Sequence, residues 1–205
     1  MREDIKIKLL QNLLEEITKK YDEFIAMQQD KIEETFEKAI KDPLTGLYNR
    51  SYFFEYSRKS FKKAKRKGEN IVLIFLDLDN FKYVNDNYGH KRGDEVLKEV
   101  ANILKNIFRE YDVIVRYGGD EFIIFAEFSS KDFGNIDNLL KFFKERVEEK
   151  FKKYTLSVSY GIAVFPFDAD NIKDLINIAD KRMYEQKKQK KMRNYVNKLR
   201  RNSFL

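Results

Sequence analysis

The first forty residues of the chain contain neither glycine nor proline, so nothing in them interrupts a helix. Apolar residues recur at alternating spacings of four and three, which is the heptad pattern of a coiled-coil seam: Leu10, Leu14, Ile17, Tyr21 and Phe24. The pattern then resumes, shifted by one position, at Ile25, Ile32, Phe36 and Ala39, and such a shift indicates a stutter within one helix. A helix of this length extends roughly 60 Å and cannot bury its stripe against itself. It needs either the following domain or a second copy of the chain, and we favour a parallel dimer stalk.

The rest of the chain alternates between predicted helices and strands. Asp42-Pro43 marks the boundary, because the residue before a proline disfavours helical backbone. Residues 71–76 (IVLIFL) form an uninterrupted apolar run and predict a buried central strand. Further strands are predicted at 113–115, 121–126 and about 155–165, and helices at 51–67, after Asp79, at 93–108, at about 136–151 and from about 171 into the tail.

This order, without its extra helices, is βαββαβ, the split unit of ferredoxin-like sheets. We therefore predict an α+β fold, a ferredoxin-like or palm-type βαββαβ sheet with extra helices, preceded by the long N-terminal coiled-coil helix. Gly118-Gly119 separates the second and third strands, and a tight hairpin turn there is expected to use the positive φ angles that glycine tolerates. Such a fold alone does not indicate a function.

Residues that the chain lacks exclude several kinds of site. It has no cysteine and one histidine, which excludes disulfide scaffolds, thiolate zinc sites, cysteine nucleophiles and multi-histidine metal sites. No apolar run approaches the roughly 20 residues that cross a bilayer, and the N-terminus is too charged for a signal peptide. We expect a cytoplasmic chain with no membrane partner.

The net charge of +7 belongs to the C-terminal tail. Residues 42–180 carry 23 basic and 23 acidic side chains, whereas residues 181–205 carry ten basic and one acidic. No aromatic residues alternate with these lysines as stacking partners for bases would. A solvated helix face is therefore favoured over a nucleic-acid interface, and no nucleic-acid partner is expected.

Two aspartates end the apolar strand, in the sequence LDLDNF. A carboxylate in such surroundings must be paired, exposed or bound to a cation, because an isolated buried charge is costly. Asp77 and Asp79 are two residues apart and project to the same side of the strand, and hard oxygen ligands at this spacing suit magnesium. A helix N-cap explains Asp79 equally well.

Two more acids follow the predicted hairpin turn, in the sequence RYGGDEF at 116–122. In a split βαββαβ sheet the middle hairpin lies beside the end of the first strand, so Asp77 and Asp120 are expected to converge. Convergent carboxylates at that position would hold two metal ions that activate an attacking hydroxyl and stabilise a leaving phosphate. From these residues alone, a surface hairpin with solvated acids is an equal alternative.

YGGDEF at 117–122 resembles the signature of GGDEF domains, the diguanylate cyclases that join two GTP molecules into cyclic di-GMP. Supporting motifs fall in the family's order: DPLTGLYNR at 42–50, FLDLDNFKYVNDNYGH at 75–90, GDEVL at 93–97, SVSYGIA at 157–163 and ADKRMYEQKK at 179–188. The resemblance covers residues 42–191. We therefore divide the chain into a stalk at 1–41, a GGDEF domain at 42–191 and a basic tail at 192–205.

The resemblance implies roles for the acidic residues. Asp77, the Leu78 carbonyl and Asp120 would hold the metal ions, two Mg²⁺ or Mn²⁺ per active site. Glu121 would assist deprotonation of the ribose 3′-hydroxyl or complete the metal shell.

The resemblance also implies a substrate-binding set. Asn85 and Asp94 would recognise guanine, and a carboxylate suits this task because it accepts hydrogen bonds from N1–H and the 2-amino group, which adenine lacks. Asp94 also argues against the members of the family that accept ATP. Phosphates would be contacted by the backbone at Phe81 and by Lys82 and Lys187.

The end of the domain departs from the family. The motif Gly-Arg-Asn is replaced by Lys190-Lys191-Met192, so Lys191 would stand in for a phosphate-binding arginine without its bidentate fork. We expect either weaker triphosphate binding or a different register of the last helix.

Arg109 and Asp112 form an RxxD string shortly before the signature. In the family such a pair binds the product cyclic di-GMP at an inhibitory site, whereas an ordinary helix-terminal salt bridge is the alternative. The position relative to Gly118 favours the inhibitory site. His90, beside Gly89, is assigned to structure as a polar loop residue, because a single imidazole does not make a metal site.

The expected function is that of a diguanylate cyclase, which converts two GTP into cyclic di-GMP and two pyrophosphates and is inhibited by its product. Each 3′-hydroxyl must attack the α-phosphate of the other nucleotide, so the expected active unit is a homodimer joined through the stalk. The main alternative is a protein that binds GTP or cyclic di-GMP without turnover, and the intact Asp77, Asp120 and Glu121 weigh against it. A nucleic-acid module that uses the basic tail is a third alternative.

Overall fold

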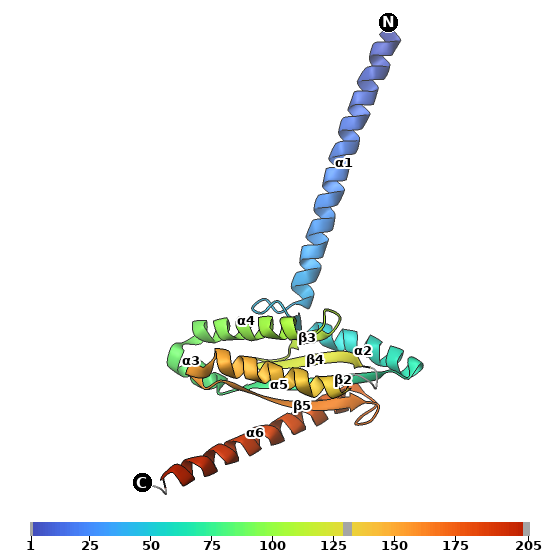
Figure 1. Cartoon of the computed structure of the whole chain (residues 1–205). Helices are drawn as coiled ribbons and strands as arrows, with labels where there is room; N and C mark the ends of the chain where they lie inside the picture. The colour runs from blue at the N-terminus through green and yellow to red at the C-terminus, as the bar shows by residue number, and fades with distance from the viewer. Residues whose placement is uncertain (1, 129–132, 203–205) are drawn as a thin grey trace. The chain divides into compact units, whose positions relative to one another are not determined.

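The computed structural model of the chain describes residues 2–128 and 133–202 and contains a five-stranded sheet with helices on both faces (Figure 1). The helices are α1 (Arg2–Ile40), α2 (Arg50–Lys67), α3 (Phe81–Tyr88), α4 (His90–Ile107), α5 (Phe133–Lys150) and α6 (Ile172–Asn202). The strands are β1 (Tyr48–Asn49), β2 (Asn70–Asp79), β3 (Val113–Arg116), β4 (Glu121–Phe128) and β5 (Ser157–Phe165). The predicted α+β fold with a long N-terminal helix is confirmed.

The chain divides into two compact units, one that ends at Ile40 and one that begins at Lys41. The first unit is α1, a continuous helix of 39 residues that passes through the predicted stutter without a break. None of its described residues is buried, and Leu14 and Ile17 of the seam are 66% and 56% exposed. Alone, this helix therefore leaves its apolar stripe in water.

The second unit is built around β2, the longest strand. The strand order is β1-β3-β4-β2-β5, with β1 parallel to β3 and the other neighbours antiparallel. Without the two-residue edge strand β1, this is the order of a ferredoxin-like sheet. β2 therefore has a hydrogen-bonded neighbour on each side, β4 and β5.

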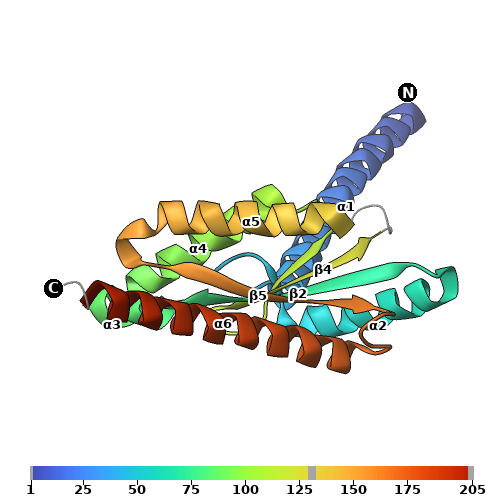
Figure 2. The same ribbon diagram turned by 60° about the horizontal axis from the view of Figure 1, so that its bottom comes forward.

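Helices cover both faces of the sheet, with α4 and α5 on one side and α2 and α6 on the other (Figure 2). Val72, Ile74, Leu76 and Leu78 of β2 are buried in the first layer, whereas Ile71, Leu73 and Phe75 are buried in the second. Both faces of β2 need apolar residues, which explains its uninterrupted apolar run. By the same alternation Asp77 and Asp79 fall on the α6 side.

Close packing of α6 on the sheet depends on Gly161 of β5. A methyl group at Gly161 would lie 2.0 Å from the carbonyl oxygen of Ala179 and 2.4 Å from the backbone nitrogen of Met183. Both of these atoms belong to the backbone of α6, which cannot move aside as a side chain can. Gly161 is therefore the position that lets α6 approach the strand.

Three local expectations are corrected. The connection from β3 to β4 spans residues 117–120, and neither Gly118 nor Gly119 has a positive φ. A four-residue connection does not need the mirror-image turn of a two-residue hairpin. His90 is the first residue of α4 rather than part of a loop. β1 and a 3₁₀ turn at Lys152–Tyr154 were not predicted, because two or three residues carry no periodicity.

Among the described residues, no helix is both long enough and apolar enough to span a membrane.

Candidate functional site

The register of β2 against β4 brings the predicted acids together. Asp77 lies opposite Glu121, and the amide of Leu78 donates to the carbonyl oxygen of Asp120 at 3.2 Å. The last residues of β2 and the first of β4 therefore meet at one end of the sheet. The expected convergence of Asp77 with the hairpin acids is present in the backbone.

Burial and mutual repulsion act together on these carboxyl groups. Burial, followed by the charge of Asp77, raises the pKa of Asp120. Burial also raises the pKa of Glu121, with further contributions from the carboxylates of Asp77, Asp120 and Asp180. Negative charge is therefore crowded at this end of the sheet, and a cation there would relieve the crowding.

Gly118 makes room for one of these acids. A side chain at Gly118 would begin 2.5 Å from Oε2 of Glu121, whereas a side chain at Gly119 would meet nothing within 4 Å. The first glycine of the pair therefore leaves room for the Glu121 carboxylate in its present position and does not serve a positive φ angle.

Two lysines of α6 pair with the two aspartates of β2. Lys187 donates to Oδ1 of Asp77 at 2.5 Å, and Lys190 donates to Oδ2 of Asp79 at 2.9 Å. Burial opposes the charge of Lys187, but its hydrogen bond to Asp77 and the nearby carboxylates raise its pKa overall. For Lys190 burial is the larger effect and lowers the pKa.

Asp79 does not cap α3, in contrast to one of the two expectations. The N-cap residue of α3 is Asn80, which has a φ of 69° and no capping hydrogen bond from its side chain. The carboxylate of Asp79 instead accepts hydrogen bonds from Ser159 and Lys190. Its direction is fixed by strand alternation, which turns it toward α6 and away from the helix start.

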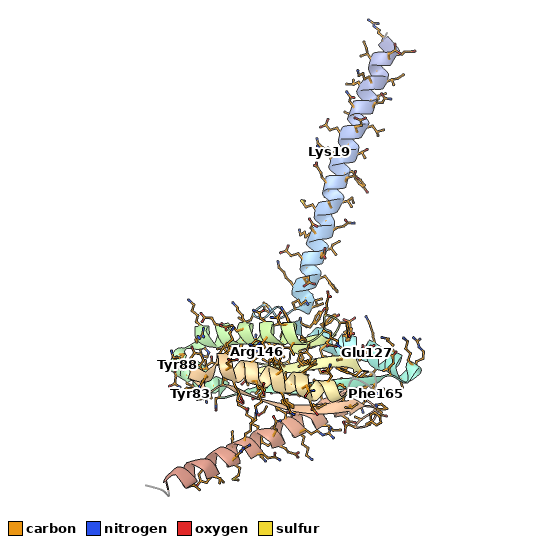
Figure 3. The ribbon with its side chains drawn as sticks, viewed as in Figure 1. Lys19, Tyr83, Tyr88, Glu127, Arg146 and Phe165 are labelled. Carbon is orange, nitrogen blue, oxygen red and sulfur yellow. The ribbon has the colours of Figure 1, made fainter. Side chains whose placement is uncertain are left out.

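A cavity of about 750 Å³ opens at this end of the sheet. Tyr83 lines it, and Figure 3 shows Tyr83 and Tyr88 at the end of the domain opposite to Glu127 and Phe165. Its other walls include these residues of the predicted site: Leu78, Phe81, Lys82, Asp120, Lys187 and Lys191. Six basic residues line the same cavity: Lys82, Lys144, Lys187, Lys190, Lys191 and Arg193. This cavity suits a ligand that carries several negative charges.

The predicted guanine-binding residues lie outside the walls of this cavity but next to one another. Asn85 is on α3 and Asp94 is in the first turns of α4. A methyl group at Gly93 would lie 1.9 Å from Oδ1 of Asn85, so the glycine before Asp94 leaves space for the Asn85 amide. Asp94 is exposed. The structure brings these two residues together without contact to the acids of β2 and β4.

The donor chemistry at the strand end fits a hard divalent cation. Asp77 and Asp120 offer carboxylate oxygens and Leu78 offers a backbone carbonyl, which are ligands that Mg²⁺ and Mn²⁺ accept. Within residues 2–128 and 133–202, however, no three acidic or histidine side chains are gathered into a closed metal-binding group. A cation there would depend on the backbone carbonyl or on a bound anion for further ligands.

The RxxD residues line a separate cavity of about 360 Å³, together with Lys41, Tyr48 and Lys105. Asp112 is only 6% exposed, and its Oδ2 accepts from the backbone amide of Arg109 at 2.9 Å. Its Oδ1 is buried and has no hydrogen-bond partner in the described structure, and burial raises its pKa. The guanidinium of Arg109 lies 5.6 Å from the ring centres of both Tyr111 and Phe128. Arg109 and Asp112 therefore interact through the backbone amide of the arginine and through the attraction between their charges.

Sequence reasoning missed Lys144, Lys190 and Arg193 as walls of the larger cavity. Lys144 lies on α5, and Lys190 and Arg193 lie on α6, far along the chain from Asp77 and Asp79. Their positive charge gave no signal, because the last helix carries many lysines with no pattern that separates wall residues from solvated ones.

Curated relatives share this domain but are longer. Diguanylate cyclase A of Treponema denticola is 34% identical over 159 residues, which are 74% of this chain and 42% of the relative. Diguanylate cyclase DgcS of Shewanella oneidensis is 36% identical over 156 residues, which are 73% of this chain and 50% of the relative. The chain thus spans half or less of the length of these relatives.

Solved structures show the same fold. The coiled coil and GGDEF domain of DgcB from Caulobacter crescentus, in complex with c-di-GMP, matches with a TM-score of 0.72 at 23% identity, over 86% of this chain and 95% of that one. Diguanylate cyclase SiaD from Pseudomonas aeruginosa, in complex with its activator SiaC, matches with a TM-score of 0.65 at 30% identity, over 91% of this chain and 72% of that one.

The sequence profile of the family described as "Diguanylate cyclase, GGDEF domain" matches residues 39–193. This match takes in the whole sheet and every residue of the candidate site. The chain therefore belongs to the GGDEF domain family of diguanylate cyclases.

Proposed function

We propose that the protein is a diguanylate cyclase that condenses two GTP molecules into cyclic di-GMP and releases two pyrophosphates. The observation that carries this proposal is the register of β2 against β4, which sets Asp77 opposite Glu121 and Asp120 beside Leu78, with Leu78 and Asp120 in the wall of a lysine-rich cavity. Acids alone would repel a nucleoside triphosphate, and lysines alone would bind it without activating a hydroxyl. Their juxtaposition supports phosphoryl transfer.

Asp77, the Leu78 carbonyl and Asp120 would hold two Mg²⁺ or Mn²⁺ ions. Bound there, the ions would neutralise charge on the reacting phosphate and lower the pKa of the attacking hydroxyl. The pKa values of Asp120 and Glu121 are raised first by burial and then by the neighbouring carboxylates, and a cation bound beside them would stabilise their charged forms, which supports this assignment. Lys187, which contacts Asp77, would turn to the phosphates when a cation takes its place.

The reaction makes one bond and breaks one at each α-phosphorus. The ribose 3′-oxygen of one GTP bonds to the α-phosphorus of the other, and the bond from that phosphorus to the bridging oxygen of pyrophosphate breaks. The hydroxyl proton passes to Glu121, a carboxylate that lies opposite Asp77 at the strand end. Two such steps close the ring and release two pyrophosphates.

Substrate binding is assigned to two groups of residues. Asn85 and Asp94 would recognise the guanine edge, and Phe81, Lys82, Lys187 and Lys191 would contact the triphosphate. The four phosphate contacts line one cavity, and the guanine contacts adjoin each other across Gly93. The Asp94 carboxylate would accept from N1–H and the 2-amino group of guanine, whereas adenine lacks both donors and would not make these hydrogen bonds.

The active unit is proposed to be a homodimer joined through α1. Each domain holds one GTP, so two domains must face each other for the mutual attack. The exposed seam of α1 would be buried between two copies, and the resulting local concentration would favour the encounter of the loaded domains. Cyclic di-GMP would then inhibit through Arg109 and Asp112, which share the smaller cavity.

The test is direct. The purified chain is incubated with GTP and Mg²⁺, and the products are separated by chromatography and identified by mass. Cyclic di-GMP and pyrophosphate in a ratio of one to two are expected, and ATP should yield no cyclic dinucleotide. Binding of GTP or cyclic di-GMP without turnover would support the alternative of a non-catalytic binding protein.

A further inference from the structure

Lys190 belongs to a cluster of polar groups at which β2, β5 and α6 meet. Its ammonium donates to Asp79 at 2.9 Å, to the hydroxyl oxygen of Ser159 at 3.0 Å and to the carbonyl of Val158. The Ser159 hydroxyl donates to the same carboxylate, with distances of 2.8 and 2.9 Å to its two oxygens. We refer to Lys190, Asp79 and Ser159 as the Lys190 cluster. Lys190 stands where the terminal Gly-Arg-Asn motif of the family has glycine.

The cluster forms part of the cavity wall. Asp79 and Lys190 both line the cavity of about 750 Å³, and their side chains are 13% and 25% exposed. Apart from Asp79, the same cavity is lined by three other acids, Asp86, Asp120 and Glu148. The charge of Asp79 therefore lies at the wall of a space that is proposed to receive a triphosphate, and Lys190 is the cation in contact with it.

The neighbouring pair of Lys187 and Asp77 differs in one respect. Asp77 is a proposed metal ligand, so its contact with Lys187 would be exchanged for contact with a cation when substrate binds. Asp79 has no such assignment, and Ser159 and Lys190 already satisfy both of its oxygens. The contact between Lys190 and Asp79 is therefore expected to persist in the loaded enzyme.

We infer that Lys190 is a positioning residue that keeps the Asp79 carboxylate neutralised and turned toward β5, so that the cavity wall does not repel the phosphates of the nucleotide. This inference rests on the proposed function, because it concerns the same cavity. In this inference Lys190 affects substrate binding through its contact with Asp79 and does not itself contact the substrate. Without Lys190, the Asp79 carboxylate would lose its ion-pair partner and keep the Ser159 hydroxyl and the charge of Lys187, which is paired with Asp77.

The inference predicts a defect that depends on charge. Lys190→Met keeps the length and flexibility of the side chain but removes its charge, and affinity for GTP with Mg²⁺ should fall roughly tenfold. Affinity for inorganic tripolyphosphate should fall similarly, and that for GMP should fall less because it carries fewer phosphates. A second substitution, Asp79→Asn, should restore the affinities of Lys190→Met, because it removes the carboxylate that the lysine compensated.

The experiment measures the three affinities by calorimetry for the wild type, Lys190→Met, and the double variant. Lys188→Met serves as a matched control, because Lys188 is exposed on the same helix, faces the ring of Tyr184 and does not line the cavity. Lys190→Gln, which keeps hydrogen-bond donors without a charge, replaces Lys190→Met if the latter is not folded by circular dichroism.

Equal loss of affinity for GMP and tripolyphosphate would show that Lys190 has only a structural role, and no recovery in the double variant would show that it does not act through Asp79. Either result would overturn the inference. Recovery of phosphate affinity in the double variant would support it. Failure of the proposed function gives a different result. The wild type would then form no cyclic di-GMP, while the pattern of tripolyphosphate affinities would still report on Lys190 and Asp79.

Discussion

The helix α1 and the unit from Lys41 onwards use apolar residues in opposite ways. On both faces of the sheet, apolar side chains of the second unit are buried in two clusters. In α1 none of the described residues is buried, and its seam is more than half exposed. The second unit therefore has its own core, whereas α1 requires a partner for its stripe. The proposed chemistry and the proposed assembly thus depend on different segments, and substitutions should separate them.

The largest effect is expected from the acids of the second unit. Asp120→Asn and Glu121→Gln should each lower kcat for cyclic di-GMP formation roughly a hundredfold or more, because charge at the reacting centre is lost. The sedimentation coefficient should not change, since neither residue lies in α1. The temperature of thermal unfolding should not fall, since each substitution removes a carboxylate that burial and its neighbours disfavour. Cyclic di-GMP formation by Asp120→Asn at the wild-type rate would remove that residue from the metal site.

Substitutions in α1 should change dimerisation without changing the residues of the candidate active site. Leu14→Lys combined with Ile17→Lys places charge in the seam of α1, where each buried apolar side chain would contribute roughly 1.5–3 kcal/mol to association. Analytical ultracentrifugation should show a weaker dimer, and specific activity should rise steeply with protein concentration.

Asn12→Lys combined with Glu16→Gln makes the same change in charge outside the seam and should leave the dimer intact. An unchanged dimer in the seam variant, or after deletion of residues 1–41, would mean that α1 is not the dimerisation element.

Packing within the second unit provides a stability test. Gly161→Val should lower the free energy of unfolding by about 3 kcal/mol, because its Cβ would overlap the backbone of α6. Gly119→Ala is the matched control, since nothing lies within 4 Å of the added methyl group, and its effect should stay within about 0.5 kcal/mol. Chemical denaturation measures both. Equal stabilities for the two variants would contradict the close approach of α6 to β5.

Regulation should respond to a residue that neither chemistry nor assembly requires. Arg109→Ala should raise the concentration of cyclic di-GMP that inhibits by about tenfold, through loss of a charge-assisted contact, and leave the initial rate unchanged. Arg66→Ala, on the exposed face of α2, is the control. Unchanged affinity for cyclic di-GMP in a calorimetric titration of Arg109→Ala would reduce the RxxD string to a local contact.

The smallest effect concerns pH. Burial raises the pKa of Asp112 above its usual value of 3.8, so the folded protein binds this proton more tightly than the unfolded chain does. The stability of the wild type relative to Asp112→Asn should therefore be greatest below pH 3.8 and decline as pH rises through the raised folded value. Denaturation at a series of pH values measures the difference. A relative stability that rises with pH would contradict the burial of an unpaired oxygen.

Most features that depend on residues close together in the sequence were predicted, whereas most contacts between residues far apart in the sequence were not. The apolar run of β2 and the heptads of α1 are local patterns, and they gave the elements and their order. The convergence of Asp77 and Asp120 followed from strand order once the fold was assigned. The contact of Lys190 with Asp79 joins residues 111 positions apart, and nothing in the spacing of the last helix distinguishes this lysine. Long-range pairs of this kind become visible only when the helix is placed on the sheet.

Because β2 is central in the sheet, it should unfold later than the end of α6. Amides in the middle of β2 are shielded by strands on two sides and by helices on both faces, so their exchange with deuterium requires unfolding of the whole unit. The final turns of α6, by contrast, expose Met192, Tyr195 and Leu199 and open by fraying. Asp77 and Asp79 therefore belong to the best-shielded strand, whereas Lys187 and Lys190 belong to a helix whose final turns are exposed. The acidic and the basic side chains of one site thus lie on elements that are expected to exchange with deuterium at different rates.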